Sequence, residues 1–250
     1  MASFHASPWQ IALSALLPIL VCLLLFRLEA KGPLSAPIHK SHGLVGPYFT
    51  SVSILFGLFA ALLANDVWQK ANEAKRAVQS EADSVHMLVH LSRAYGLEAV
   101  VLPKLKTYVH AASAEQPHSG SIESQREATG EAYLDLLTAI SQAQGLDSPA
   151  HTSLQATTRE LLRAHDSRFY LASDVTAPVK WLAILIFGTI TQVALLLVHV
   201  PNRRAMRVAV ALFTVAFCFC LIVVAIFDAP FEIVLSDEPG TTLREALRRL

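Results

Sequence analysis

The stretch SILFGLFAALLANDVWQKANEAKRAVQSEADSV, residues 53–85, decides how this chain folds. It starts as an apolar run and becomes a charged run near Asp66, with no proline and, after Gly57, no glycine. Because proline and glycine are the residues that most often interrupt a helix, the stretch predicts one helix that passes from a membrane into water without a break. Such a helix can transmit position rigidly, or build the neck of an oligomer or the wall of a vestibule.

The charged half of this stretch keeps a helical pattern. Apolar residues recur at spacings of three and four, at Ala71, Ala74, Val78, Ala82, Val85 and Val89. Polar residues occupy the opposite face, at Lys70, Glu73, Arg76, Gln79 and Asp83. A narrow apolar stripe of this kind is typical of a helix in a bundle or coiled coil, and it stays in phase with the apolar run before it. We therefore expect one uninterrupted helix that ends near Gly96.

The composition places the chain among membrane proteins, because 53% of its 250 residues are hydrophobic and only 16% are charged. A membrane-spanning helix needs about 20 apolar residues. Four runs have roughly that length: Trp9–Leu28, Tyr48–Asn65, Pro178–Val200 and Met206–Phe227. No basic residue precedes the first run, which is also too long for a signal peptide, so we interpret it as a retained span.

These runs predict an all-α membrane protein with four transmembrane helices and a helical bundle inserted between the second and the third. The expected parts are residues 1–67 with the first two spans, 68–177 with the extramembrane bundle, 178–228 with the last two spans, and 229–250 as a tail. Inside the bundle, further helices are expected at about 104–114 and 123–144, and a last one starts at DSP, residues 147–149, with Pro149 in its first turn, and runs to about Ser173.

The tail is expected to form a short amphipathic helix. Thr242 and Glu245 have the spacing of a capping box, and Leu243, Leu247 and Leu250 fall on one helical face. This apolar face predicts that the helix lies on the membrane or on the bundle, or that it docks a partner.

The short loops carry the charges that orient the spans. Basic residues stand after the first span at Arg27, Lys31 and Lys40, and between the third and fourth spans at Arg203, Arg204 and Arg207. Lysine and arginine in short loops favour the cytoplasmic side of a membrane. We therefore predict that the bundle and both termini lie outside the cytoplasm.

Several motifs resemble the bacterial bestrophin-like family. GLVGPYF at residues 43–49 resembles the family's entry to its second span. LFGLFAALLANDVW at 55–68, followed by NEAKRAVQSEA at 72–82, resembles its helix from membrane to bundle. Further similar elements are Tyr108-Val109, PVKWL at 178–182 with Gly188, and DAPFEIVLSDEPGTTLREAL at 228–247. The family's acidic-Trp-Pro element stands here as Glu115-Gln116-Pro117, without the aromatic residue, and the usual glycine after Pro-Phe in the tail is absent.

The resemblance implies kinship with bestrophin anion channels, which are pentamers, and a location in the bacterial inner membrane. In those channels the second span lines a hydrophobic neck and continues into a helical domain, which implies that Ile54 and Leu58 face a pore. Bestrophins place that domain in the cytoplasm, opposite to the orientation predicted here. We follow the loop charges, because six basic residues in two short loops are a direct orientation signal.

The second span offers candidates for lining a pore. Ile54, Leu58 and Leu62 recur every four residues and would form an apolar constriction if several copies assembled in a ring. Asn65 and Asp66 end the span and would form a polar ring at the pore mouth. The alternative is that the apolar residues face lipid and that Asn65 and Asp66 only close the apolar run at the membrane interface.

Two further groups of polar residues lie on predicted helices. Asp83, His86 and His90 share one helix face and could contribute to a metal site if another ligand were supplied, but a solvated or interhelical face is the alternative, and we assign no metal. Gln192 is polar within the third span, where such residues usually hydrogen-bond to neighbouring helices.

Nothing in the sequence indicates an enzyme or a cofactor, since there is no GxSxG, phosphate-binding loop, dinucleotide motif or strong zinc spacing. The formal net charge of zero gives no sign of a nucleic-acid partner. Cys22, Cys218 and Cys220 lie in apolar runs and are interpreted as small buried hydrophobes.

The expected partners are the lipid bilayer and either copies of the chain or other membrane subunits. The expected function is ion passage, of anions by resemblance; the alternative is a structural or accessory subunit of a larger membrane complex.

Overall fold

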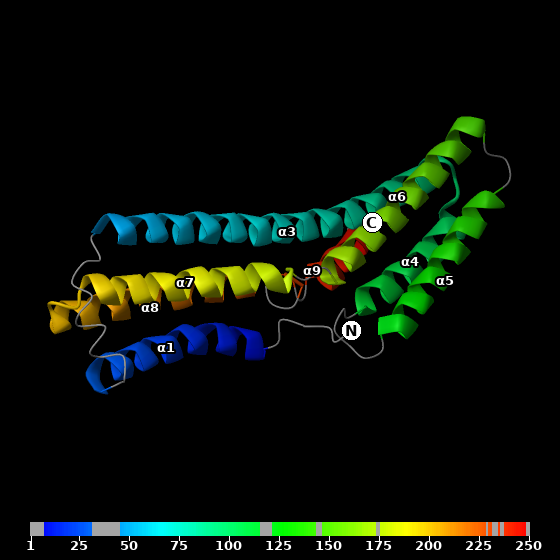
Figure 1. Ribbon diagram of the computed structural model, residues 1–250. Coiled ribbons are helices and arrows are strands. Elements are labelled where there is room, and N and C mark those ends of the chain that lie inside the picture. The colour runs from blue at the N-terminus through cyan, green and yellow to red at the C-terminus, as the bar shows by residue number, and fades with distance from the viewer. Residues whose placement is uncertain are drawn as a thin grey trace. The chain divides into compact units, whose positions relative to one another are not determined.

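The computed structural model describes residues 8–31, 46–115, 122–143, 147–173, 176–228, 230–231, 235 and 238–248. All regular elements in these ranges are α-helices, which confirms the all-α prediction. In chain order they are α1 Pro8–Lys31, α3 Gly46–Ala94, α4 Glu98–Ala114, α5 Ile122–Ser141, α6 Ser148–Ser173, α7 Pro178–Val198, α8 Arg203–Asp228 and α9 Glu238–Arg248 (Figure 1).

The helices form two compact units. We call Met1–Gln69 with Val175–Ala229 the apolar unit, and Lys70–Asp174 with Pro230–Leu250 the bundle unit. The apolar unit contains α1, α7 and α8, and the bundle unit contains α4, α5, α6 and α9. Helix α3 begins in the apolar unit and ends in the bundle unit, so it belongs to both.

Helix α3 is a single helix of 49 residues, which confirms that residues 53–85 belong to one unbroken helix. It ends at Ala94 in a Schellman motif, in which Leu97 N–H donates to the Ser92 carbonyl at 2.7 Å and Gly96 N–H donates to the Arg93 carbonyl at 3.2 Å. Gly96 has a φ of 68°, a left-handed conformation that favours glycine. The glycine expected to end the helix therefore does so by its backbone geometry.

Three of the described helices, α3, α7 and α8, are long and apolar enough to cross a membrane. The first predicted run lies within α1, which contains Pro18 and packs against α7 and α8. The span candidates differ in how much of them the protein itself covers. Only 11% of the apolar window of α3 is buried, against 39% for α7 and for α8. Most of the apolar surface of α3 therefore faces outward from its own chain.

The inward face of α3 packs on α7 and α8. Leu63 and Val67 join Ile184 of α7 and Leu221 of α8 in one buried cluster. The ring of Phe217 in α8 lies against Gly188 of α7, where an added Cβ would come within 2.1 Å of the ring. Because Gly188 has no side chain, the Phe217 ring can occupy the space between α7 and α8.

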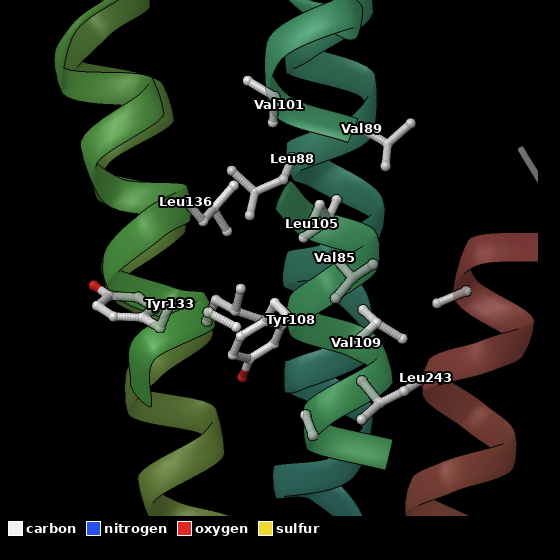
Figure 2. Packing of buried hydrophobic residues seen from close by; sticks show 14 of the residues in the cluster. Val85, Leu88, Val89, Val101, Leu105, Tyr108, Val109, Tyr133, Leu136 and Leu243 are labelled. Carbon is white, nitrogen blue, oxygen red and sulfur yellow. The ribbon is translucent and has the colours of Figure 1, made fainter. Parts of the chain in front are cut away.

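The bundle unit has its own hydrophobic core, shown in Figure 2. Side chains from α3, α4, α5 and α9 meet there with at most 1% of their surface exposed, among them Val85, Leu88, Val89, Val101, Leu105, Tyr108, Val109, Leu136 and Leu243. Full burial of one such aliphatic side chain stabilises a fold by roughly 1.5–3 kcal/mol. Five members of the predicted stripe, from Ala74 to Val89, are buried, so the helical pattern marked the core face correctly.

The helices of the insert differ from the prediction mainly at their ends. Helix α4 begins at Glu98, so the prediction of a start near Lys104 was wrong. Pro103 lies inside α4, where it removes one backbone hydrogen bond, and the core burial of Val101 and Leu105 outweighs that loss. Helix α6 begins as expected, with the Asp147 carboxylate accepting the Ala150 N–H at 3.1 Å.

The C-terminal tail belongs to the bundle unit. Phe231 and Leu235 are buried in a cluster with Ala74 and Val78 of α3. The amphipathic helix α9 then packs on α4 and buries Leu243 and other apolar residues of one face. The sequence predicted that this helix lies on the membrane or on the bundle, or docks a partner; in the structure it lies on the bundle. The predicted capping box at Thr242 was wrong, because α9 starts at Glu238 and Thr242 lies within the helix.

Candidate functional site

The predicted pore residues lie on the outward face of α3. Ile54, Leu58 and Leu62 are 62%, 58% and 60% exposed. Asn65 is also exposed, and Gly57 on the same side has open space where a Cβ would project. The structure therefore gathers four of the five predicted pore residues on one uncovered face, which is available to lipid, to a pore or to another copy of the chain.

Asp66, the fifth predicted pore residue, is turned toward α7. Its carboxylate Oδ2 accepts a hydrogen bond from Lys180 Nζ at 2.6 Å, and the two side chains are partly exposed. This pair joins the end of the apolar half of α3 to the first turn of α7. Asp66 and Asn65 are thus neighbours in sequence but have different surroundings.

A second carboxylate, Asp228 at the end of α8, also lies at the start of α7. Asp228 is buried and accepts the Thr176 N–H at 3.1 Å and the Trp181 Nε1–H at 3.2 Å. A negative charge at a helix N-terminus is favourable, because the free N–H groups there carry partial positive charge. Trp181 therefore has a specific partner in Asp228, which sequence analysis missed.

Within the apolar unit, Gln192 connects three helices. Its Nε2 donates to the Pro18 carbonyl of α1 at 3.2 Å and to Thr214 Oγ1 of α8 at 2.8 Å. The prediction that Gln192 hydrogen-bonds between helices is confirmed. Near the C-terminal end of α1, the buried Glu29 pairs with Arg203 Nε at 3.1 Å and Arg207 Nη2 at 3.9 Å. Two of the three arginines in the first turns of α8 thus neutralise a carboxylate of α1.

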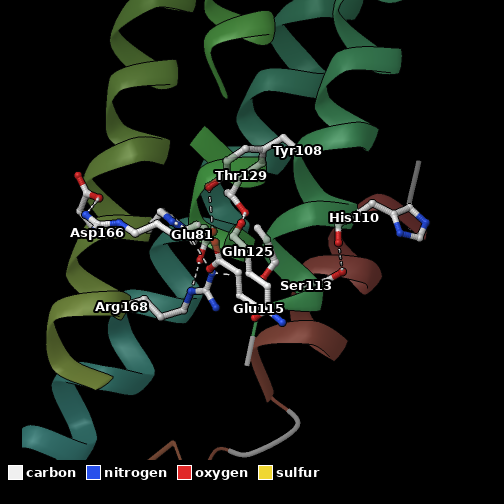
Figure 3. A network of polar contacts seen from close by, with 12 residues as sticks. Glu81, Tyr108, His110, Ser113, Glu115, Gln125, Thr129, Asp166 and Arg168 are labelled. Atoms are coloured by element: carbon white, nitrogen blue, oxygen red, sulfur yellow. Dashed lines mark hydrogen bonds and ion pairs between the residues drawn. The ribbon is translucent and has the colours of Figure 1, made fainter. Parts of the chain in front are cut away.

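The densest polar arrangement lies in the bundle unit, where side chains from α3, α4 and α6, with that of Glu115 just after α4, form a buried cluster (Figure 3). We call Glu81, Tyr108, Glu115, His165 and Arg168 the charge cluster. Arg168 Nε lies 2.8 Å from Glu81 Oε2, and Arg168 Nη2 lies 3.0 Å from Glu115 Oε2. The Tyr108 hydroxyl donates to Glu81 Oε1 at 2.9 Å. The Nε–H of Arg168 is not well aligned with Glu81, so that contact is an ion pair more than a hydrogen bond.

The surroundings set the ionisation of these groups. Burial raises the pKa of Glu81, but the opposing effects of Arg168, His165 and Tyr108 outweigh it and leave the pKa below its usual value. Burial and the adjacent Glu81 charge raise the pKa of Tyr108 well above its usual value. The bundle unit therefore holds an ionised carboxylate beside a neutral phenol deep in its core.

Sequence analysis missed this cluster, although one signal pointed to it. Glu81 lies between Val78 and Val85 on the predicted buried stripe, where a charge is out of place. A carboxylate at such a position requires a partner from another helix. His165 and Arg168 are one helical turn apart on α6 and supply it.

The predicted metal candidates are not drawn together. Over the described part of the chain, no group of three or more His, Cys, Asp or Glu side chains is arranged to hold a metal ion, and Asp83, His86 and His90 form none. Asp83 and His90 are exposed on α3, and His86 is half-buried. The three residues therefore occupy the outer side of the helix, away from the charge cluster.

Comparisons with known proteins agree with this architecture. A family model described as the Bestrophin-like domain matches residues 12–236. The fold is similar to crystal structures of a bacterial bestrophin homologue from Klebsiella pneumoniae. One single-residue variant gives a TM-score of 0.74 at 14% identity and covers 98% of this chain and 98% of that chain. Another gives a TM-score of 0.69 at 13% identity and covers 96% of this chain and 98% of that chain. A zinc-phased structure gives a TM-score of 0.69 at 13% identity, covering 96% of this chain and 97% of that chain.

At this identity the structural likeness shows the fold alone. No curated protein matches the chain. The family model, however, spans α3 to α8 completely and most of α1. The chain is therefore a member of the bestrophin-like family.

Proposed function

We propose that the chain is a four-span membrane protein that assembles with copies of itself and passes ions, with anions preferred. In this proposal α1, α3, α7 and α8 are the spans, and the bundle of α4, α5 and α6 is the insert between the second and third. The preference for anions rests on kinship with bestrophins. The division of the chain into residues 1–67, 68–177, 178–228 and 229–250 belongs to the same proposal.

The observation that carries the proposal is the outward apolar face of α3. Ile54, Leu58 and Leu62 are each more than half exposed, and the apolar window of α3 is the least covered of the three span candidates. Helices in membranes associate through close packing at small residues, and Gly57 and Ala61 are exposed beside this face. In a ring of copies, the face would form an apolar constriction that opens by wetting.

The test is the oligomeric state together with ion flux. The full chain is purified in detergent, its mass is measured by light scattering, and it is reconstituted into liposomes loaded with an anion-sensitive dye. A ring of identical copies that passes chloride supports the proposal. A monomer without flux, or a fixed ratio to other membrane proteins in native extracts, contradicts it and supports an accessory subunit instead.

A further inference from the structure

One end of the apolar unit carries four arginines. Arg203 Nε lies 3.1 Å from Glu29 Oε1 and Arg207 Nη2 lies 3.9 Å from Glu29 Oε2, so the C-terminal end of α1 and the N-terminal end of α8 meet there. Arg27 lies two residues before Glu29, Arg204 directly follows Arg203, and both are exposed. We call Arg27, Arg203, Arg204 and Arg207 the arginine cluster.

Glu29 is the one carboxylate of the apolar unit at this end. In the sequence of that unit, acidic residues occur only at Glu29, Asp66 and Asp228. Asp66 and Asp228 contact the first turn of α7, whereas the arginine cluster lies beyond the last turn of the same helix. The cluster therefore has more positive charge than the apolar unit neutralises.

Glu29 accounts for the positions of two of the four arginines. Its side chain is 0% exposed, whereas those of Arg203 and Arg207 are 57% and 55% exposed, so both guanidinium groups reach from an enclosed carboxylate toward the surface. Among the described residues, no carboxylate pairs with Arg27 or Arg204. These two exposed arginines are available to a negatively charged group from outside the chain.

Arg204 stands at the head of the outward apolar face of α8. Val208, Leu212, Val215 and Phe219 follow it at helical spacings of three or four, and each is between 59% and 69% exposed. Helix α8 is one of the helices long and apolar enough to cross a membrane. Arginine side chains near the end of such a helix extend to the level of the lipid headgroups.

Arg27 has the corresponding place on α1. Leu16, Leu20 and Leu23 precede it at the same helical spacings, and each is more than half exposed. Because Glu29 joins α1 to α8, both outward apolar faces end in an arginine at the same end of the unit. A long apolar surface with a cation at one end matches a molecule that has long apolar chains and an anionic headgroup.

We propose that the arginine cluster binds the phosphate of an anionic phospholipid, which Arg204 and Arg27 contact directly and whose acyl chains lie on the outward face of α8. Guanidinium groups bind phosphate oxygens through paired hydrogen bonds, and basic residues beside a span attract anionic lipids. Arg203 and Arg207 add positive charge, and Glu29 holds them in place. The lipid site depends on the proposed spans α1 and α8, but not on assembly or ion passage.

The experiment measures lipid binding to the purified full chain in detergent by native mass spectrometry. The probes are phosphatidylglycerol, which is anionic, and phosphatidylcholine, whose phosphate is balanced by its own ammonium group. One basic residue near a membrane surface changes the affinity for anionic lipid about fivefold. We therefore expect the wild type to bind phosphatidylglycerol more tightly than phosphatidylcholine by at least this factor.

The variants locate the site. Arg204→Gln should raise the Kd for phosphatidylglycerol about fivefold, and combining it with Arg27→Gln should raise the Kd about 25-fold, with little change for phosphatidylcholine. Arg204→Lys keeps the charge and should keep most of the preference. Arg76→Gln is the matched control, because it removes one positive charge at an exposed position of the bundle unit and should leave both Kd values unchanged. Circular dichroism checks that each variant is folded.

Several outcomes would overturn the proposal. Equal binding of the two lipids by the wild type, or equal effects of Arg204→Gln and Arg76→Gln, would show that the cluster is not a lipid site. Displacement of the lipid by excess glycerol phosphate would show a site for free phosphate instead. A smaller assembly mass of Arg204→Gln would show that a second copy covers this face. Since no ion flux is measured, a chain that binds the lipid without conducting would contradict only the proposed function.

Discussion

At the scale of single residues, Glu81 departs from its surroundings most. It is fully buried on a stripe of small apolar side chains, and its carboxylate faces Arg168, His165 and Tyr108. Replacing such a pair by apolar residues can be neutral, but removing one partner leaves the other charge buried alone. We therefore expect the fold to lose less stability when the whole cluster is replaced by apolar residues than when one of its charged residues is removed.

The first prediction concerns Glu81→Gln, which keeps the side-chain shape and removes the charge. We expect the free energy of unfolding of the bundle unit to fall by about 3 kcal/mol, because Arg168 keeps only Glu115 as a counter-charge. Urea titration of the full chain in detergent measures it. Glu73→Gln, at an exposed position of the same helix, should change it by less than about 0.5 kcal/mol. Equal effects of the two variants would contradict the structural role given to Glu81.

The second prediction uses the low pKa of Glu81. A carboxylate with a lowered pKa in the folded state stabilises the fold above its unfolded pKa of about 4.3, and this contribution is lost as pH falls through the folded value. The stability difference between wild type and Glu81→Gln should therefore be constant near neutral pH and shrink below about pH 4. Urea titrations at a series of acid pH values measure it, and a difference that grew on acidification would refute the assignment.

The third prediction concerns Leu58, which is 58% exposed on the outward face of α3. If the face lines a pore, Leu58→Ser should wet the constriction and raise anion flux in liposomes. Leu212→Ser is the matched control, because Leu212 is 66% exposed on α8 and should leave flux unchanged. If the wild type conducts and both variants conduct as it does, then Leu58 faces lipid.

At the scale of elements, α3 is the helix on which both units depend. Its apolar half packs on α7 and α8 through Leu63 and Val67, and its other half enters the bundle core through Val85 and Val89. No proline lies between Phe49 and Ala94, so the hydrogen-bonded ladder runs unbroken past Asp66.

The fourth prediction is that Ala74→Pro disrupts α3 and the folding of the bundle unit. Proline inside a helix removes a backbone hydrogen bond and clashes with the preceding turn, at a cost of about 3 kcal/mol or more. Ala74→Gly, the control, should cost only about 1 kcal/mol in helix propensity. Circular dichroism and the detergent-solubilised mass of the full chain measure folding and assembly. Unchanged folding in Ala74→Pro would show that α3 need not be continuous.

What the sequence could predict was periodic or local. The spacing of Ala74, Val78 and Val85 showed which face of α3 is buried, and Gly96 marked its end. The polar contacts of the sites join residues far apart in the chain, as Lys180 joins Asp66, and no local pattern encodes such a pairing. The charge of Glu81 on an apolar stripe was the exception, since it shows that a partner exists without showing which one.

At the scale of the whole molecule, the orientation in the membrane is the property that the loop charges address. The fifth prediction is that the bundle unit lies outside the cytoplasm. Cysteine introduced at the exposed Ser167 of α6 should react with an impermeant maleimide on intact cells. Cysteine at the exposed Asn202, between α7 and α8, should react only after permeabilisation.

The chain without an added cysteine already contains Cys22, Cys218 and Cys220, so its reaction with the maleimide is measured in parallel as the background. The reverse pattern would place the bundle unit in the cytoplasm, as the resemblance to bestrophin channels implies. Both outcomes leave the fold unchanged, because they concern only which side of the membrane each loop occupies.

The position of the tail has a consequence for biosynthesis. Leu243 of α9 completes the core around α4, and Phe231 completes the cluster around Ala74, yet both follow α8 in the chain. During translation, α3 to α6 emerge with these apolar surfaces uncovered, and they stay so until α7 and α8 have left the ribosome. The bundle unit can therefore close only after α7 and α8 have been synthesised. If α7 and α8 failed to fold correctly, α9 could not pack on α4. The uncovered apolar side chains of the bundle unit would then be exposed to proteases and chaperones.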